Sequence, residues 1–329
     1  MKSKKQNIVL FSGILLALLI LFFTAINVGS LKVSVSELFR GLFIEYNGTV
    51  ATIYDLRFPR IFVALLAGGA IAVSGVLFQA VLKNPLADPA LVGICSGANF
   101  TALIVVSLAP KLFYSIPLLA SVGGLITCGL IYSLSWKEGL NPLRIILVGV
   151  AIDAILSGIL EAFGSMGGSS SSGVASIVSA SITMKTWKDV KILAIYVGIT
   201  MIVAFCIAGK CNLLALEDRT AKSIGVPIHW VRLYVSVIAV VLASTSTAIV
   251  GVIGFLGLIV PHIARLLIGS DCRKLIPFSF LFGAFTLLLA DTIGRVILAP
   301  MEVSASVIMA IIGGPFFIFL LRRKSVSNQ

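Results

Sequence analysis

Long stretches of apolar residues, separated by short polar segments, run through almost the whole chain. They fall at residues 8–28, 61–82, 90–109, 112–134, 143–163, 190–209, 231–268, 275–298 and 303–321. Most of them have the length of about 20 residues that an α-helix needs to cross the hydrocarbon core of a bilayer. The pattern therefore predicts an all-α membrane protein.

The seventh stretch is too long for one crossing. No Lys, Arg, Asp or Glu occurs in residues 233–264, and one helix over this range would extend about 48 Å, well beyond a core of about 30 Å. Glycines interrupt the stretch from Gly251 onward. We therefore expect two crossings, near 231–250 and 255–268, which brings the total to ten transmembrane helices.

Composition and charge agree with this topology. Of the 329 residues, 59% are hydrophobic and 12% are charged, whereas soluble domains have about 25% charged residues. Ten crossings put both termini on one side. If that side is the cytoplasm, the cytoplasmic segments carry sixteen Lys and Arg residues and the external segments nine, as the positive-inside rule requires. The net charge of +12 then reflects topology rather than binding to nucleic acid.

The largest cytoplasmic segment on this topology, residues 211–228, has the features of a short amphipathic helix. Its charged residues share one stretch, and Gly225 and Pro227 suit its end. Two interpretations are open: a solvated turn, or a helix that docks on a cytoplasmic partner. The docking interpretation involves Leu213, Leu216, Glu217, Asp218, Arg219, Ala221, Lys222, Ile224 and Gly225.

Three arginines are expected at the external surface. Arg57 and Arg60 lie at the mouth of the second crossing, and Arg295 lies on the ninth. Guanidinium groups there could bind carboxylates of a partner bidentately, or they could be interface arginines whose side chains reach toward water. Asp291 precedes Arg295 by four residues, so these two side chains are expected to pair on one helical face.

Other residues that could take part in proton transfer or metal binding have few suitable partners nearby in the sequence. Asp153 and Glu161 lie two turns apart on the fifth crossing, where ionisable groups suggest function. A proton relay and a capping or cavity-contacting role are both open, and the lack of a basic partner nearby in sequence favours the second. His262 has no neighbouring metal ligand, which favours packing. The five cysteines show no CxxC spacing, so neither a disulfide nor a metal site is expected.

Several motifs of catalysis and nucleotide binding are absent from the sequence. No Gly-x4-Gly-Lys-Ser/Thr occurs, so the chain is not expected to hold ATP in a P-loop. No HExxH or GxSxG supports a membrane enzyme. Two transport hypotheses are left: a permease powered by a partner, and a secondary transporter driven by protons through Asp153 and Glu161.

Short motifs in both halves of the chain occur in one known combination. They are LRFPR (56–60), AVSGVLFQ (72–79), NPLADP (84–89), SGA (96–98), SIGV (223–226), GFLGLIVPH (254–262), AD (290–291) with Arg295, and GGPFF (313–317). This combination resembles the FecCD-type permeases of ABC transporters, which import iron-siderophores, haem or cobalamin. The resemblance extends from about residue 29 to the C-terminus.

The resemblance implies one transmembrane permease domain over residues 1–329, folded as a cobalamin-importer-like (type II) ABC permease bundle. It implies a bacterial cytoplasmic-membrane protein with both termini in the cytoplasm. The expected partners are a second permease subunit, identical or paralogous, a dimer of ABC ATPases, an extracellular or periplasmic substrate-binding (lipo)protein, and membrane lipid. The chain is expected to be no enzyme and to bind no cofactor or metal, because ATP is used by the partner ATPase.

The resemblance also implies roles for particular positions. Residues 213–227 would dock on the ATPase, and Arg57, Arg60 and Arg295 would receive acidic residues of the binding protein. The expected cargo is an iron chelate, either an iron-siderophore or haem, with cobalamin as the alternative. Residues 183–187 (TMKTW) depart from the common family pattern and resemble some haem permeases of Gram-positive bacteria.

Overall fold

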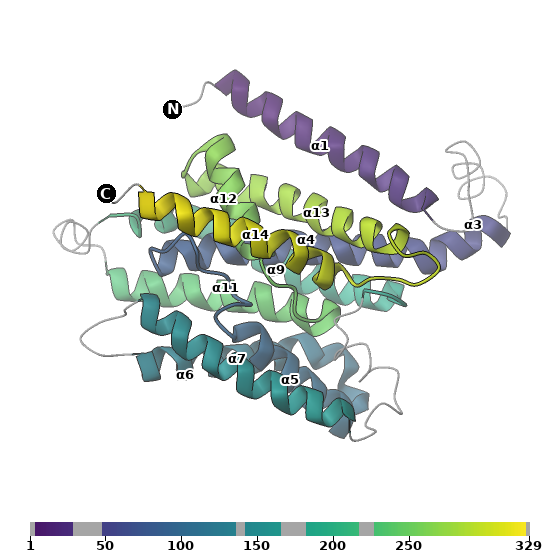
Figure 1. Cartoon of the computed structure of the whole chain (residues 1–329), viewed down its shortest axis with the longest axis horizontal. Helices are drawn as coiled ribbons and strands as arrows, with labels where there is room; N and C mark the ends of the chain where they lie inside the picture. The colour runs from purple at the N-terminus through teal and green to yellow at the C-terminus, as the bar shows by residue number, and fades with distance from the viewer. Residues whose placement is uncertain (1–3, 29–47, 136–141, 166–181, 217–226, 327–329) are drawn as a thin grey trace.

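The computed structural model describes residues 4–28, 48–135, 142–165, 182–216 and 227–326, which are helical and contain no strand. The helices carry the labels of Figure 1. Their bounds are α1 (Lys4–Asn27), α3 (Gly48–Thr52), η1 (Ile53–Arg57), α4 (Phe58–Val81), α5 (Ile94–Leu108), η2 (Pro110–Ser115), α6 (Ile116–Ser135), α7 (Pro142–Ser165), α9 (Trp187–Leu213), α11 (Ile228–Val250), α12 (Leu256–Ile268), α13 (Cys272–Val296) and α14 (Ala305–Val326).

Ten of these helices correspond to the ten predicted crossings. Over the described residues, seven are long and apolar enough to span a membrane, and three shorter apolar helices lie in α5, α12 and α14. At about 1.5 Å per residue, α5 and α12 are only about 20 Å long. Non-helical chain, most of it buried or half-buried, precedes each of them, at residues 82–93 and 251–255. Irregular backbone is tolerated at membrane depth where protein surrounds it.

The predicted break in the seventh apolar stretch is confirmed. Helix α11 ends at Val250, and α12 begins at Leu256. Gly251 and Phe255 both have positive φ angles, of 75° and 65°. Glycine adopts such a conformation at little cost, so Gly251 is the residue that lets the chain leave the first helix and start a second one.

Helix α4 lies at the centre of the bundle. It packs against α9, α11, α12 and α13, and most of its side chains are buried. Two glycines allow the closest approaches: a Cβ on Gly68 would lie 2.4 Å from the carbonyl oxygen of Gly283, and one on Gly75 would lie 2.0 Å from that of Gly257. Small residues that let backbones approach are typical of helix contacts in membranes.

The helices form two groups of four with the same pattern of neighbours. The first group is α4 to α7 and the second is α11 to α14. Helix α4 packs on α13 and α12, just as α11 packs on α6 and α5, and the second, third and fourth helices of each group contact one another. Helix α4 is the second crossing and α11 is the seventh. Because helix directions alternate along the chain, the two groups run in opposite directions, as the inverted repeats of many transporters do.

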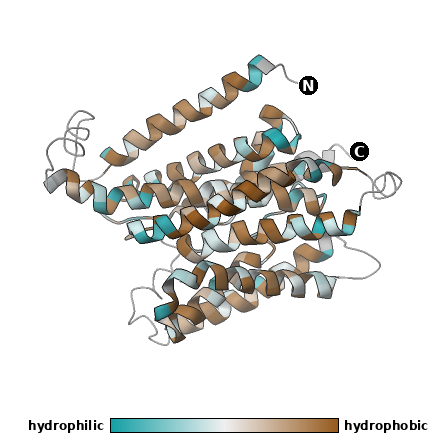
Figure 2. Ribbon diagram, turned by 180° about the vertical axis from the view of Figure 1, so that it is seen from behind, coloured by the Kyte–Doolittle hydropathy of each residue, from teal (hydrophilic) through white to brown (hydrophobic). Residues whose placement is uncertain are grey.

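Hydrophobic residues predominate along most of the helices (Figure 2). Leu16 and Ile20 on α1, and Ile195 and Ile199 on α9, are exposed, as expected for side chains that face lipid. Helix α1 lies at the edge of the bundle (Figure 1) and contacts α13, with the Phe11 and Phe278 rings 5.3 Å apart. Both chain termini lie toward the same end of the bundle (Figure 1), as an even number of crossings requires.

Candidate functional site

The three arginines singled out in the sequence lie at one end of the bundle, here named the arginine end. Arg60 in the first turn of α4 is buried and forms a bidentate pair with Asp291 of α13. Its Nε lies 3.0 Å from Oδ2 and its Nη2 lies 2.8 Å from Oδ1. Its Nη1 donates to Glu302 at 2.8 Å. Arg60 thus ties α4 to α13 and to the chain that follows α13.

The other two arginines fasten α1 to the same end. Arg295 lies 3.4 Å from Asp291, which confirms the predicted pair, and donates to the carbonyl oxygen of Ala25 at 3.3 Å. Arg57 donates to the carbonyl oxygen of Ile26. The last turn of α1 therefore packs directly on the arginine cluster, defined here as Arg57, Arg60 and Arg295.

The structure changes how this cluster is understood. The side chains of Arg60 and Arg295 are only 10% and 7% exposed, and both face Asp291. Their charges are therefore largely balanced within the chain. Burial acts to raise the pKa of Glu302, but the hydrogen bond and charge of Arg60 outweigh it, so this pKa lies below its ordinary value. Sequence reasoning missed Glu302 because it lies in a non-helical connection with no spacing relation to Arg60.

The opposite end of the bundle, here named the Lys83 end, holds the end of α9 and the start of α13. The Asn212 side chain donates to Asp271 at 2.8 Å and accepts from the backbone N–H of Cys272 at 2.8 Å. Asp271 caps α13 by accepting from the backbone N–H of Arg273. The bond from Asn212, with the positive charge nearby, lowers the pKa of Asp271.

The predicted docking segment begins at this end. Its residues 217–226, which include Glu217, Asp218, Arg219, Ala221, Lys222, Ile224 and Gly225, lie outside the described part of the chain. The described residues show how the segment is attached. Leu213 is the last residue of α9, and the carbonyl oxygen of Leu216 accepts a hydrogen bond of 2.5 Å from Lys83, just after α4.

Three of the family motifs meet inside the bundle. Gln79 at the end of α4 donates to the carbonyl oxygens of Ala87, at 3.2 Å, and Gly257, at 3.1 Å, and accepts from Arg265 of α12. Gln79 therefore joins the NPLADP segment to the GFLGLIVPH segment, although the sequence separates these motifs by more than half the chain.

Asp88 of the NPLADP motif is fully buried. Its Oδ1 accepts from the backbone N–H of Ala90 at 2.7 Å, in the turns that precede α5. A Cβ on Gly257 would lie 3.1 Å from Oδ2, so this carboxylate faces the first turn of α12, where unpaired N–H groups favour negative charge. The contact explains why an acid and a glycine occupy these motif positions.

The remaining candidate residues from the sequence do not come together in one site. Asp153 on α7 accepts a hydrogen bond from Ser96 in the first turn of α5, and Glu161 is exposed. The ring of His262 packs edge-on against Phe316, with centroids 5.9 Å apart. Among the described residues, no group of three or more His, Cys, Asp or Glu side chains could hold a metal ion.

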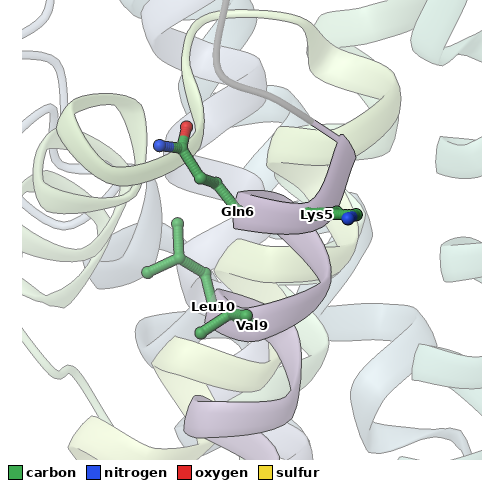
Figure 3. Close-up of a pocket in the computed structure, with 4 residues that line it drawn as sticks. All are labelled: Lys5, Gln6, Val9 and Leu10. Carbon is green, nitrogen blue, oxygen red and sulfur yellow. The ribbon is translucent and has the colours of Figure 1, made fainter.

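A pocket of about 380 Å³ at the start of α1 is not a convergent site. Figure 3 shows its lining residues Lys5, Gln6, Val9 and Leu10. All four come from the first turns of one helix, and Lys5 points away from Gln6 and Leu10 (Figure 3). Binding sites for small ligands usually bring polar groups from several elements together, so this pocket is no candidate for a cargo site.

This all-helical arrangement, with short broken helices inside two inverted repeats, is that of a multi-pass ABC transporter permease. The FecCD transport family matches residues 17–323, and the chain belongs to this family. The predicted fold and family are confirmed.

Individual relatives agree with the family match. The chain is 41% identical over 320 residues, 97% of each protein, to the "Probable heme-iron transport system permease protein IsdF" of Staphylococcus aureus strain Newman. It is 40% identical to the protein of the same name from strain MSSA476, with the same coverage.

Solved structures show the same fold. A metal-chelate type ABC transporter in an inward-facing conformation matches with a TM-score of 0.79 and 28% identity, over 96% of this chain and 99% of that one. The PsaBC structure from Streptococcus pneumoniae, in complex with Fab, matches with a TM-score of 0.55 at 17% identity, over 87% of this chain and 95% of that one. The second likeness shows the fold alone.

Proposed function

We propose that this permease carries an iron chelate, with haem as the first candidate, into the cytoplasm. The observation that supports this best is the 41% identity, over 97% of both chains, to a protein named as a heme-iron transport permease. An iron-siderophore is the second candidate. The chain would act with a second permease subunit, with a separate ATPase pair, and with an external binding protein.

We propose that the Lys83 end faces the cytoplasm. Both chain termini lie toward this end (Figure 1). The segments on this side then carry sixteen of the 25 Lys and Arg residues, in agreement with the positive-inside rule. The arginine end would face outward.

We propose that residues 211–228 dock on the ATPase. The sequence has no P-loop of its own, and the segment is attached to three helices of the Lys83 end, through Lys83 and Asn212. A partner that pulls on the segment would therefore move α13 and the end of α4. Reversing Glu217 and Asp218 to lysine should abolish ATP-driven transport, because the reversed charges would repel the partner surface that the acidic residues attract.

The control for this test is Lys5→Glu, a charge reversal on an exposed residue at the same end. It should leave coupling intact. Loaded binding protein should stimulate the ATPase in the wild-type complex. If it stimulates the Glu217→Lys/Asp218→Lys complex equally, residues 211–228 are not the docking site.

We propose that the arginine cluster receives acidic residues of the binding protein. Arg57 is the clearest test of this role, because Arg60 and Arg295 also hold the buried Asp291, and their reversal would damage the fold. Arg57→Glu should weaken binding-protein capture by purified transporter, whereas Lys111→Glu, an exposed residue outside the cluster, should not. Equal affinities of the two variants would exclude Arg57 from the docking surface.

The cargo itself is tested with the complete transporter in proteoliposomes. Haem-loaded binding protein outside and ATP in contact with the ATPase should give haem accumulation inside, and ATP omission should stop it. If vesicles that hold this chain alone accumulate haem when a pH gradient is applied, the protein is instead a proton-driven secondary transporter.

A further inference from the structure

Two cysteines that are far apart in the sequence meet at the Lys83 end. Cys211 lies near the end of α9 and Cys272 is the first residue of α13. Their side chains lie close together and line the same cavity. The neighbouring backbone holds them together, because the N–H of Cys272 donates to the side chain of Asn212, the residue after Cys211. Spacing in the sequence gave no indication of this pair.

Both thiols line one cavity of about 290 Å³ between α4, α9, α12 and α13. The cavity walls include the exposed residues Lys83, Ala215 and Ser270, so it opens to the surface at this end. Cys211 and Cys272 are only 1% and 6% exposed. A molecule of the size of water or peroxide can therefore reach the sulfur atoms, whereas a large reagent is hindered.

The surroundings of Cys272 favour a reactive sulfur. The residue stands at the N-terminus of α13, where the helix dipole attracts negative charge, and Arg265 lines the same cavity. A thiolate next to positive charge and a helix N-terminus is the typical setting of a redox-active cysteine. Cys211 lies in contact with it, as a resolving thiol must.

We propose that Cys211 and Cys272 form an oxidisable dithiol, a modification site at which peroxide converts the two thiols into a disulfide. The thiolate of Cys272 attacks one peroxide oxygen, the O–O bond breaks, and a sulfenic acid and one water form after protonation. The thiol of Cys211 then attacks the sulfenic sulfur and releases a second water. Two thiols lose two electrons and two protons, and one peroxide is reduced to two waters.

The disulfide would join the end of α9 covalently to the start of α13. Residues 211–216, the root of the segment proposed to dock on the ATPase, could then no longer shift relative to α13. This consequence rests on the proposed function: transport of the iron chelate would slow when peroxide is present, and a thiol reductant would restore it.

The site is tested on the full chain in lipid nanodiscs. The protein is treated with hydrogen peroxide, free thiols are alkylated, and the unreduced digest is analysed by mass spectrometry. We expect a linked peptide pair that contains residues 211 and 272, with two fewer alkylated thiols among the five cysteines, and we expect dithiothreitol to reverse both changes. Complete alkylation of Cys211 and Cys272 after peroxide, or separate sulfinic acids on them, would overturn the proposal.

A second measurement tests the consequence in the transporting complex. Peroxide should remove most ATP-driven haem uptake by the wild type and by the control Cys206→Ser, which changes an exposed cysteine of α9. Cys272→Ser should transport as the reduced wild type does and should resist peroxide. Equal peroxide sensitivity of Cys272→Ser and the wild type would show that the disulfide between α9 and α13 is not what slows transport. Absence of haem uptake by the reduced wild type would instead refute the proposed cargo, and the peptide analysis would still decide the dithiol.

Discussion

Replacing Arg60 with methionine leaves the Asp291 carboxylate without its bidentate partner in the interior of the arginine end. Asp291 is 2% exposed, and Arg60 approaches it through Nε and Nη2 at 2.8–3.1 Å. Methionine keeps the length of an apolar side chain, so the change removes charge and hydrogen bonds with little loss of packing volume.

The expected loss follows from the burial of the two partners. Breaking a buried ion pair costs about 3–5 kcal/mol, because one charge stays behind without compensation. Arg295 still lies 3.4 Å from Asp291, so we expect a loss near the lower end, about 3 kcal/mol. Glu302 is 41% exposed, and its contact with Arg60 should add less than about 1 kcal/mol.

The free energy of unfolding can be measured by titration with sodium dodecyl sulfate in mixed micelles. Arg57→Met is the matched control at the same end. It removes a hydrogen bond to a backbone carbonyl and should cost about 1 kcal/mol. The Glu302→Gln variant reports the exposed contact separately. An Arg60→Met loss no larger than that of Arg57→Met would refute the assignment of Arg60 to a buried ion pair.

Two further predictions concern packing and pH. Gly75→Ala should cost about 1–3 kcal/mol or more, because its Cβ would lie 2.0 Å from the carbonyl oxygen of Gly257. Gly129→Ala, on an open face of α6, should be neutral or slightly stabilising, and equal losses in the same titration would contradict the close contact. The lowered pKa of Asp271 means that its stabilising effect is full above the ordinary value of 3.8 and is lost as the pH falls through the lower folded value. Melting temperatures should therefore drop more steeply below about pH 4 in the wild type than in Asp271→Asn; parallel curves would show that the carboxylate makes no such contribution.

The path of the chain through the membrane could be predicted from the sequence with few errors. The apolar stretches gave the ten crossings, and the charge-free length of residues 233–264 gave the break that the structure places at 251–255. These predictions succeed because the length and hydrophobicity of a span are local properties that the bilayer tests directly. The family motifs were readable for a related reason, since each is a short contiguous segment.

The candidate site was only partly readable. The pairing of Asp291 with Arg295 followed from their spacing of four residues on a helix. The stronger partner, Arg60, lies 231 residues from Asp291, and no periodicity connects positions so far apart. The three arginines were expected to be available to a partner, whereas the structure uses two of them to balance a buried carboxylate.

What the sequence alone determined is therefore the kind of molecule: an all-α chain with ten crossings, similar to one permease family. Only the tertiary structure decided which polar groups meet inside it. Asp88 faces Gly257, and Cys211 lies beside Cys272, because segments that are far apart in the sequence pack side by side. Hydrophobicity drives every apolar segment into lipid without regard to order, whereas close packing and the pairing of buried polar groups select one arrangement of those segments.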